Sequence, residues 1–290
     1  MTVVPWRLNN LAAIFGTLSQ QTCLPDHLYV HIPRILKRKQ MKYPPLPQEL
    51  LETAQRLPFP VTFNPCEDEG PITKLYPVLE LEQEPETILL LVDDDTTLHA
   101  NKIQYIKQLY QSMQFRNQNA AFSGGGWIIG NLFGPTGLLH VQNAKGLTEV
   151  SVLQGHDGFA LKRKYLDNVA DLLNYALLLP SEKLQNAAKM HDDVWISCYL
   201  ERKNVTKYVH PGCPRTLLQD HRGLSDKKHE FLLKLFPLQY HLQQQGFFQQ
   251  PINCELPYKA LGFRMWLVVI LLLFFSALIL LNLLRHSEIY

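Results

Sequence analysis

Cysteine is scarce in this chain and follows no recognisable pattern. The five cysteines are an odd number, and none belongs to a C-x-x-C pair or to a His/Cys cluster with the spacing of metal ligands. They are widely spaced, at Cys23, Cys66, Cys198, Cys213 and Cys254. The pattern favours reduced thiols, and hence a domain that faces the cytosol.

A strong charge of either sign is also missing. The 28 Lys and Arg residues nearly balance the 26 Asp and Glu residues, which leaves a net charge of +2 and a pI near 8.2. A nucleic-acid-binding domain normally shows a strongly basic face. We therefore expect no nucleic-acid partner.

The N-terminal segment lacks the continuous apolar run of a signal peptide. Residues 1–18 are interrupted by Pro5, Arg7, Asn9 and Asn10. We therefore expect the domain to stay on the side of the membrane where it is made.

One long hydrophobic run is present, near the C-terminus. Residues 265–284 contain no charged side chain, and Arg264 and Arg285 bracket them. Twenty helical residues span about 30 Å, the thickness of a hydrocarbon core. The alternative, a buried core helix, fits these flanks less well. The sequence predicts a main domain at 1–211, an extension of unassigned role at 212–262, a single transmembrane anchor at 263–285 and a short tail at 286–290. It places the main domain on the cytosolic face of a membrane.

The remaining chain alternates strand-like and helix-like segments, which predicts an α/β fold. The apolar run 87–92 fits a strand buried on both faces of a parallel or mixed sheet. The other predicted strands are 27–32, 61–63, 120–122, 150–153 and 205–209. The predicted helices are 48–57, 74–81, 100–114, 166–179 and 192–202. The basic segment 34–42 is expected to be a loop, either solvated or in contact with phosphates or acidic lipid headgroups.

Three adjacent carboxylates, Asp93, Asp94 and Asp95, follow the apolar strand. In open α/β sheets ligands bind at the carboxyl ends of strands. Clustered carboxylates repel one another unless a cation or a proton offsets their charge, and oxygen ligands suit Mg²⁺ or Mn²⁺. The motif therefore predicts a metal site. The alternative is a solvated acidic turn that caps the next helix.

A second acidic pair, Asp192 and Asp193, begins the helix predicted at 192–202. Carboxylates at this position are favoured by the unpaired amides and the dipole of the helix, so simple capping explains them as well as catalysis does.

The two acidic motifs together resemble the GT-A glycosyltransferases. In that family a D-x-D motif ends a buried strand, as Asp93 to Asp95 do. A glycine-rich loop similar to Gly155-His156-Asp157-Gly158 lies on the acceptor side, and an acidic pair begins a helix. Some members also carry Thr-x-Pro-x-Arg, similar to Thr2, Pro5 and Arg7 with one residue of slack. The same members also carry Asp-x-Gly-Pro-x-x-Lys-Leu, similar to the segment from Asp68 to Leu75.

The resemblance implies a Rossmann-like GT-A fold with a mixed, mostly parallel sheet flanked by helices, and it implies roles for individual residues. Asp193, with Asp192 beside it, would act as the general base. Asp93, Asp95 and His210 would hold Mn²⁺ or Mg²⁺, with His221 as the alternative histidine. The nucleotide-sugar site would comprise Arg7, Asp68, Lys74, Asp93, Asp94, Gly155 and Gly158.

These roles describe a transferase that inverts the anomeric centre. The implied donor is a UDP- or GDP-sugar, and the acceptor is a glycan, a lipid or a protein, with the membrane as a further partner. Because only residues 1–4 precede Pro5, the first strand is expected to be truncated.

Two alternatives remain. The order Asp93-x-Asp95-x-Thr97 also resembles the first motif of haloacid-dehalogenase-type phosphatases, in which the first Asp is the nucleophile. Those enzymes place their second acidic motif at the end of another strand. A non-catalytic nucleotide-sugar-binding protein is the other possibility.

Overall fold

The computed structural model describes residues 1–129, 138–142, 144–174, 179–211 and 216–217, together with residues 238, 241–242, 245 and 247. All of them belong to the first of the two units into which the chain divides, Met1–Ile252. Within this described part, no helix combines the length and the hydrophobicity needed to cross a bilayer. The anchor at 263–285 and most of the extension at 212–262 lie outside it and stay predictions.

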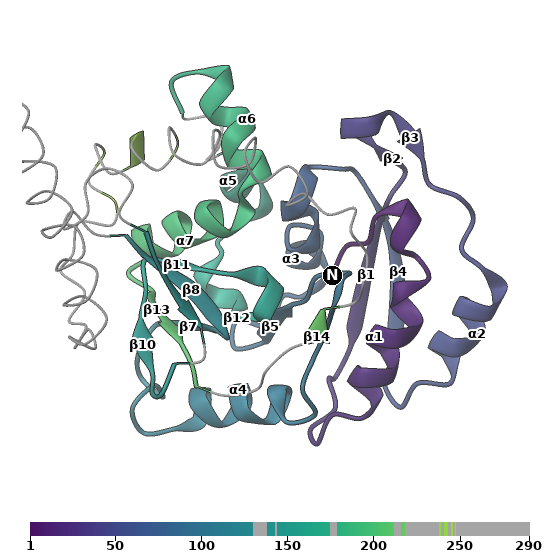
Figure 1. Cartoon of the computed structure of the whole chain (residues 1–290), viewed down its shortest axis with the longest axis horizontal. Coiled ribbons are helices and arrows are strands. Elements are labelled where there is room, and N and C mark those ends of the chain that lie inside the picture. The colour runs from purple at the N-terminus through teal and green to yellow at the C-terminus, as the bar shows by residue number, and fades with distance from the viewer. Residues whose placement is uncertain are drawn as a thin grey trace, which may run out of the picture. The chain divides into compact units, whose positions relative to one another are not determined.

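A five-stranded mixed sheet forms the centre of the fold (Figure 1). Its strands are, in spatial order, β10 (Thr148–Glu149), β13 (Thr206–Val209), β7 (Ala120–Ser123), β12 (Phe159–Lys162) and β5 (Ile88–Leu91). Strand β13 pairs parallel with β7, whereas β12 pairs antiparallel with both β7 and β5. Strands β5, β7 and β13 therefore run in one direction, and the predicted mixed α/β architecture is confirmed.

This shared direction brings three chain segments to one edge of the sheet. Asp93 follows β5, and His210 follows β13. The segment 155–158 precedes the oppositely directed β12, whose Phe159 pairs with Leu91 and Ser123. The predicted site residues of distant segments thus meet at a single edge.

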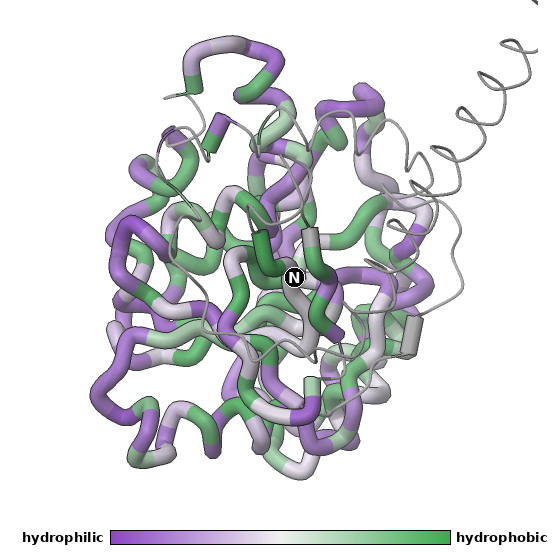
Figure 2. Tube along the Cα trace, turned by 60° about the vertical axis from the view of Figure 1, so that its left-hand side comes forward, coloured by the Kyte–Doolittle hydropathy of each residue, from purple (hydrophilic) through white to green (hydrophobic). Residues whose placement is uncertain are grey.

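Helices cover both faces of this sheet. One face packs against α4 (Lys102–Gln111), and the other against α6 (Glu182–Met190) and α7 (Asp192–Arg202). In β5, Leu89 and Leu91 point to the α7 side, whereas Ile88 and Leu90 pack on the α4 side. The expectation that this strand is apolar on both faces is confirmed. Figure 2 shows hydrophobic stretches in the central strands and polar ones on the outer loops.

A second strand pair flanks the central sheet. Strands β1 (Leu28–Pro33) and β4 (Val61–Cys66) pair in parallel, and Thr2 forms one parallel bridge with His31. The segment before Pro5 contributes this single bridge and no longer strand. Helices α1 (Asn10–Ser19) and α2 (Gln48–Gln55) share an apolar cluster with this pair.

A small antiparallel sheet stands beside Gly155. It contains β11 (Val152–Leu153), β8 (Gly125–Ile129) and β9 (Leu138–Gln142). The sequence analysis predicted no strand at β9. The other short elements are β2 (Ile35–Leu36), β3 (Met41–Lys42), β6 (Thr96–Thr97), β14 (Thr216–Leu217), α5 (Val169–Asn174) and the 3-10 helices η1 (Pro5–Arg7), η2 (Lys37–Lys39), η3 (Gly70–Lys74), η5 (Gly155–Asp157) and η6 (Arg163–Tyr165).

Several predicted segments differ from the structure. The helix expected at 74–81 is reduced to α3 (Val78–Leu81), preceded by the end of η3 at Lys74, because Pro77 lacks an amide hydrogen and disfavours helical geometry in the preceding residue. The helix expected from residue 166 begins at Val169, in α5. The segment 34–42 forms the β2–β3 hairpin, in which Gln40 adopts a left-handed conformation with φ of 49°. The helix expected at 100–114 ends at Gln111, so Met113 follows it and is 95% exposed.

Candidate functional site

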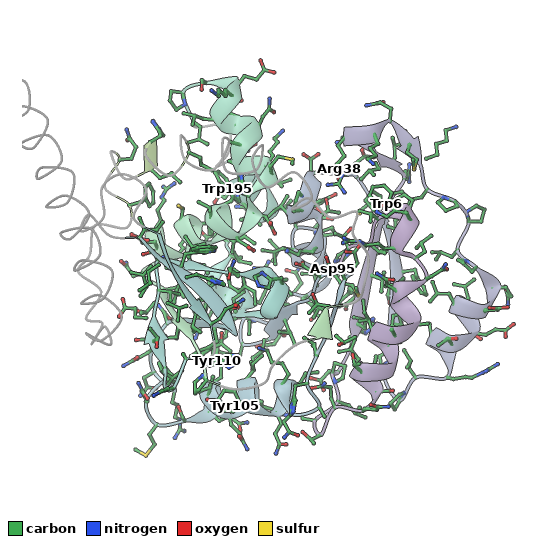
Figure 3. The ribbon with its side chains drawn as sticks, in the orientation of Figure 1. Trp6, Arg38, Asp95, Tyr105, Tyr110 and Trp195 are labelled. Carbon is green, nitrogen blue, oxygen red and sulfur yellow. The ribbon has the colours of Figure 1, made fainter. Side chains whose placement is uncertain are left out.

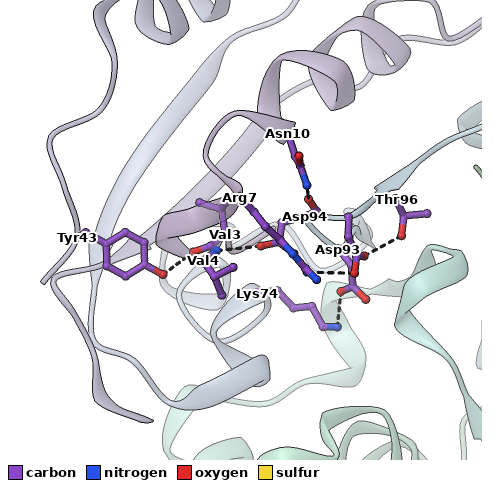
Figure 4. A network of polar contacts seen from close by, with 10 residues as sticks. Val3, Val4, Arg7, Asn10, Tyr43, Lys74, Asp93, Asp94 and Thr96 are labelled. Carbon is purple, nitrogen blue, oxygen red and sulfur yellow. Dashed lines mark hydrogen bonds and ion pairs between the residues drawn. The ribbon is translucent and has the colours of Figure 1, made fainter. Parts of the chain in front are cut away.

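The three carboxylates after β5 differ in exposure and in partners. The side chains of Asp93 and Asp95 are each 28% exposed, whereas that of Asp94 is only 10% exposed. Asp94 faces the N-terminal segment, where Val4 N and Arg7 Nη1 donate to its two oxygens at 2.8 and 2.7 Å (Figure 4). The outer two carboxylates are thus left accessible while the middle one fixes the turn.

Arg7 ties the turn to the N-terminal segment. Its buried guanidinium also lies 3.0 Å from Asp95 Oδ2, so one Nη1 atom contacts two of the three carboxylates. Burial raises the pKa of Asp94, and Arg7 counteracts part of that rise, which leaves the pKa at about 6. Arg7 therefore supports the acidic turn directly; its predicted contact with a nucleotide stays a prediction.

Lys74 joins the two acidic motifs. Its Nζ donates to Asp93 Oδ1 at 2.7 Å and lies 2.9 Å from Asp192 Oδ2, and its side chain is 5% exposed. Burial by itself lowers the pKa of Lys74, but Asp192, Asp93 and Asp193 outweigh it and hold the pKa well above its usual value. One buried ammonium thus bridges motifs that are about one hundred residues apart.

The acidic pair lies in the first turn of α7, which begins at Asp192 as predicted. Asp193 Oδ1 accepts a hydrogen bond from the backbone amide of Gly155 at 2.9 Å. Burial and the neighbouring Asp192 raise the pKa of Asp193 well above its usual value, although Lys74 opposes the rise. Asp192 therefore contacts Lys74, and Asp193 contacts the glycine loop. Simple helix capping requires neither contact.

Gly155 is the closest point of the glycine loop to this cluster. A Cβ atom at this position would lie 2.7 Å from Lys74 Nζ and 3.0 Å from Asp193 Oδ1. The sequence analysis grouped Gly155 with Lys74 in the nucleotide site, and the structure brings Gly155 close to both Lys74 and Asp193.

We expect Gly155→Ala to destabilise the protein by about 1–3 kcal/mol, because the methyl group forces Lys74 or Asp193 out of place. Gly146→Ala is the matched control, since a Cβ there meets no atom within 4 Å. Urea unfolding of both variants tests this expectation. Equal stability of the two variants would show that the loop shifts to accommodate the methyl group without cost.

The loop also brings His156 towards Asp93. Burial raises the pKa of Asp93, but Lys74 and, more weakly, His156 outweigh it, so the pKa lies below its usual value. The sequence analysis gave His156 no role. The sequence feature that could have indicated a role for His156 is its position directly after Gly155 in the glycine loop.

Three further predicted site residues, Asp68, Gly158 and His210, lie against other partners. Asp68 accepts hydrogen bonds from the amides of Lys37 and Gly70 at 2.7 and 2.9 Å, and so holds the β2–β3 hairpin to the η3 turn. Gly158 has a φ of 78° and lies against Lys102. Lys102 Nζ in turn donates to His210 Nε2 at 2.9 Å.

The metal site itself stays a prediction. Within the described residues, no group of three or more His, Cys, Asp or Glu side chains is arranged to hold a metal ion. His221 lies outside those residues. The donors that fit best are Asp93 and Asp95, because Mg²⁺ is usually held by one or two carboxylates together with substrate phosphates.

Figure 3 shows the positions of Trp195 and Trp6, which lie on either side of Asp95 in that view. Trp195 is buried in α7, and its Nε1 donates to Leu172 O at 3.1 Å. Trp6 lies beside the hairpin, with Lys39 Nζ 4.4 Å and Arg38 Cζ 5.8 Å from its ring centroid.

Comparison with known proteins adds no assignment. No protein-family model and no curated protein matches this chain. Its function is therefore inferred from the convergence of Asp93, Lys74, Asp192, Asp193 and Gly155.

Proposed function

We propose that the chain is a glycosyltransferase that moves a sugar from a nucleotide-sugar donor to an acceptor hydroxyl. One observation carries this proposal: Asp93, which follows β5, and Asp192, at the start of α7, both lie within 2.9 Å of the single ammonium of Lys74. A donor-side and an acceptor-side acidic motif must face one another for such a transfer. The GT-A fold is part of the same proposal.

Asp93 and Asp95 are the residues that would hold Mn²⁺ or Mg²⁺. Both are carboxylates with partly exposed side chains on either side of the buried Asp94. When bound, the metal would offset the charge on the diphosphate leaving group. Arg7 contributes by fixing the turn that carries both carboxylates.

Asp193 is the proposed general base. A base works best when its pKa lies close to the working pH, and burial with Asp192 raises the pKa of Asp193 in that direction. The Gly155 amide fixes one of its oxygens. A single displacement assisted by this carboxylate inverts the anomeric centre.

The phosphatase alternative gains no support from the fold. Its second acidic motif would follow a strand, whereas Asp192 and Asp193 follow α6, which ends at Met190. A non-catalytic nucleotide-sugar-binding protein would keep the same residues, and only turnover separates it from a transferase.

Donor hydrolysis tests the proposal. With Mn²⁺ and a panel of UDP- and GDP-sugars, the full chain is expected to release the nucleoside diphosphate. Asp95→Ala should reduce the rate about 100-fold or more, because it removes a metal ligand beside the leaving group. Asp26→Ala, an exposed carboxylate remote from β5 in the sequence, is the control. A phosphoaspartate at Asp93 would instead support a phosphatase, and metal-dependent binding without turnover would support a binding protein.

A further inference from the structure

One face of the small β11–β8–β9 sheet combines an aromatic ring with imidazole and amide groups. Trp127 of β8 pairs directly with His140 of β9, and their ring centroids are 4.4 Å apart at an interplanar angle of 31°. Gln142 pairs with Gly125, two residues along each strand from that pair. Because side chains alternate along a strand, Trp127, His140 and Gln142 belong to the same face.

Two residues of the loop after β11 complete this face. His140 Nε2 donates to Gln154 Oε1 at 2.6 Å, and Gln142 Nε2 lies 3.4 Å from His156 Nε2. We call these five residues, Trp127, His140, Gln142, Gln154 and His156, the amide face.

The amide face is joined to the proposed base. Gln154 and His156 flank Gly155, whose amide donates to Asp193 Oδ1 at 2.9 Å. In addition, Leu153 N donates to Ser197 Oγ at 3.0 Å, which fixes β11 against α7, the helix that carries Asp193. A molecule on the amide face would therefore lie next to the Asp193 carboxyl group.

The chemistry of the amide face suits a sugar. None of its five side chains is a carboxylate, an ammonium or a guanidinium, and its amides and imidazoles can both donate and accept hydrogen bonds. His140 and Gln142 are exposed, and Trp127 and His156 are half-buried. Sugar hydroxyls need such mixed donors and acceptors, and the C–H face of a sugar packs on aromatic rings. A lipid chain would need an apolar groove, and a phosphate would need cations.

We propose that the amide face binds a neutral sugar of the acceptor and presents its hydroxyl to Asp193. This inference rests on the proposed transferase function and narrows the acceptor class to carbohydrates. In the transfer, the acceptor oxygen forms the new bond to the anomeric carbon. The bond from that carbon to the diphosphate oxygen breaks, and the hydroxyl proton passes to Asp193.

Binding can be tested without a donor. The full chain, in a detergent without a sugar headgroup, is mixed with methyl glycosides of glucose, galactose, mannose and N-acetylglucosamine, and saturation-transfer NMR records contact. At least one glycoside is expected to bind, and Gln142→Ala and His140→Ala should weaken binding about 5-fold or more. Gln108→Ala, an exposed glutamine on α4, is the control. Trp127 also packs on the core, so Trp127→Phe is preferred to alanine at that position.

Turnover separates the two proposals. With an active nucleotide sugar, Gln142→Ala should reduce the ratio of transfer to donor hydrolysis about 10-fold, because water needs no acceptor site. If the glycosides do not bind, if Gln142→Ala behaves as wild type, or if only lipid or peptide acceptors react, the amide face is not the acceptor site. If a glycoside binds there but no donor is ever hydrolysed, the transferase proposal fails while the sugar site stands.

Discussion

Lys74→Met is expected to lower the free energy of unfolding by about 3–5 kcal/mol at neutral pH. Methionine keeps most of the side-chain volume but removes the ammonium that contacts Asp93 and Asp192. The two carboxyl groups would then share a buried space without a counter-charge, and Asp193 nearby would add to the repulsion. Urea unfolding of the full chain, followed by tryptophan fluorescence, measures the change.

The matched control is Lys164→Met. Lys164 Nζ also lies close to a carboxylate, at 2.6 Å from Glu86 Oε1, but both side chains are substantially exposed to water. An ion pair of this kind contributes less than about 1 kcal/mol. Adding Asp192→Asn to Lys74→Met should recover part of the lost stability, since it removes one uncompensated charge. A similar small loss for both lysines would show that the Lys74 bridge is not a major source of stability.

Local sequence patterns were sufficient to predict the elements that carry the acidic motifs. The helix predicted from Asp192 begins there, because carboxylates are favoured in a first helical turn. The apolar run before Asp93 forms a strand with apolar neighbours on both faces, as its composition predicts. In both places the information lies within a few neighbouring residues.

The contacts that assemble the site could not be predicted in this way. Lys74 meets Asp93 and Asp192 only because η3 and α7 pack near the end of β5, and no local pattern encodes that meeting. The sequence analysis grouped Lys74 with the nucleotide site and did not predict that it bridges the two acidic motifs. Strand β9 was missed, and its pairing with β8 is what places His140 opposite Trp127. His210 was expected at the metal, whereas its Nε2 contacts Lys102.

The charges around Lys74 do not balance. Asp93, Asp192 and Asp193 surround a single ammonium, so the ionisation of at least one of these carboxyl groups is electrostatically unfavourable. The pKa of Asp93 is lowered, whereas that of Asp193 is raised well above its usual value. The cost therefore falls on Asp193, the residue that must accept a proton in the proposed reaction. Its environment destabilises the ionised carboxylate, and proton uptake converts that carboxylate to the neutral acid.

Asp193→Asn is accordingly expected to abolish transfer while stabilising the fold. Loss of the base should reduce the rate of transfer about 100- to 10,000-fold. The amide oxygen of asparagine can still accept the Gly155 hydrogen bond, and the buried charge is removed, so the free energy of unfolding at pH 7 should rise by about 1–2 kcal/mol. Transfer assays and urea unfolding of the same preparation measure both effects. Asp26→Asn, at an exposed position, should change neither.

The pH dependence of the difference in unfolding free energy between the wild type and Asp193→Asn identifies the cause of that difference. Because the pKa of Asp193 is raised in the folded state, the folded wild type holds a proton that the unfolded chain releases above its pKa of roughly 3.9. Wild-type stability therefore falls, relative to Asp193→Asn, by up to about 1.4 kcal/mol per pH unit as the pH rises from that value towards the folded pKa. The two proteins should be nearly equal in stability near pH 4 and diverge towards neutrality. A constant difference across this range would mean that the variant acts through packing, and an undiminished transfer rate would remove Asp193 as the base.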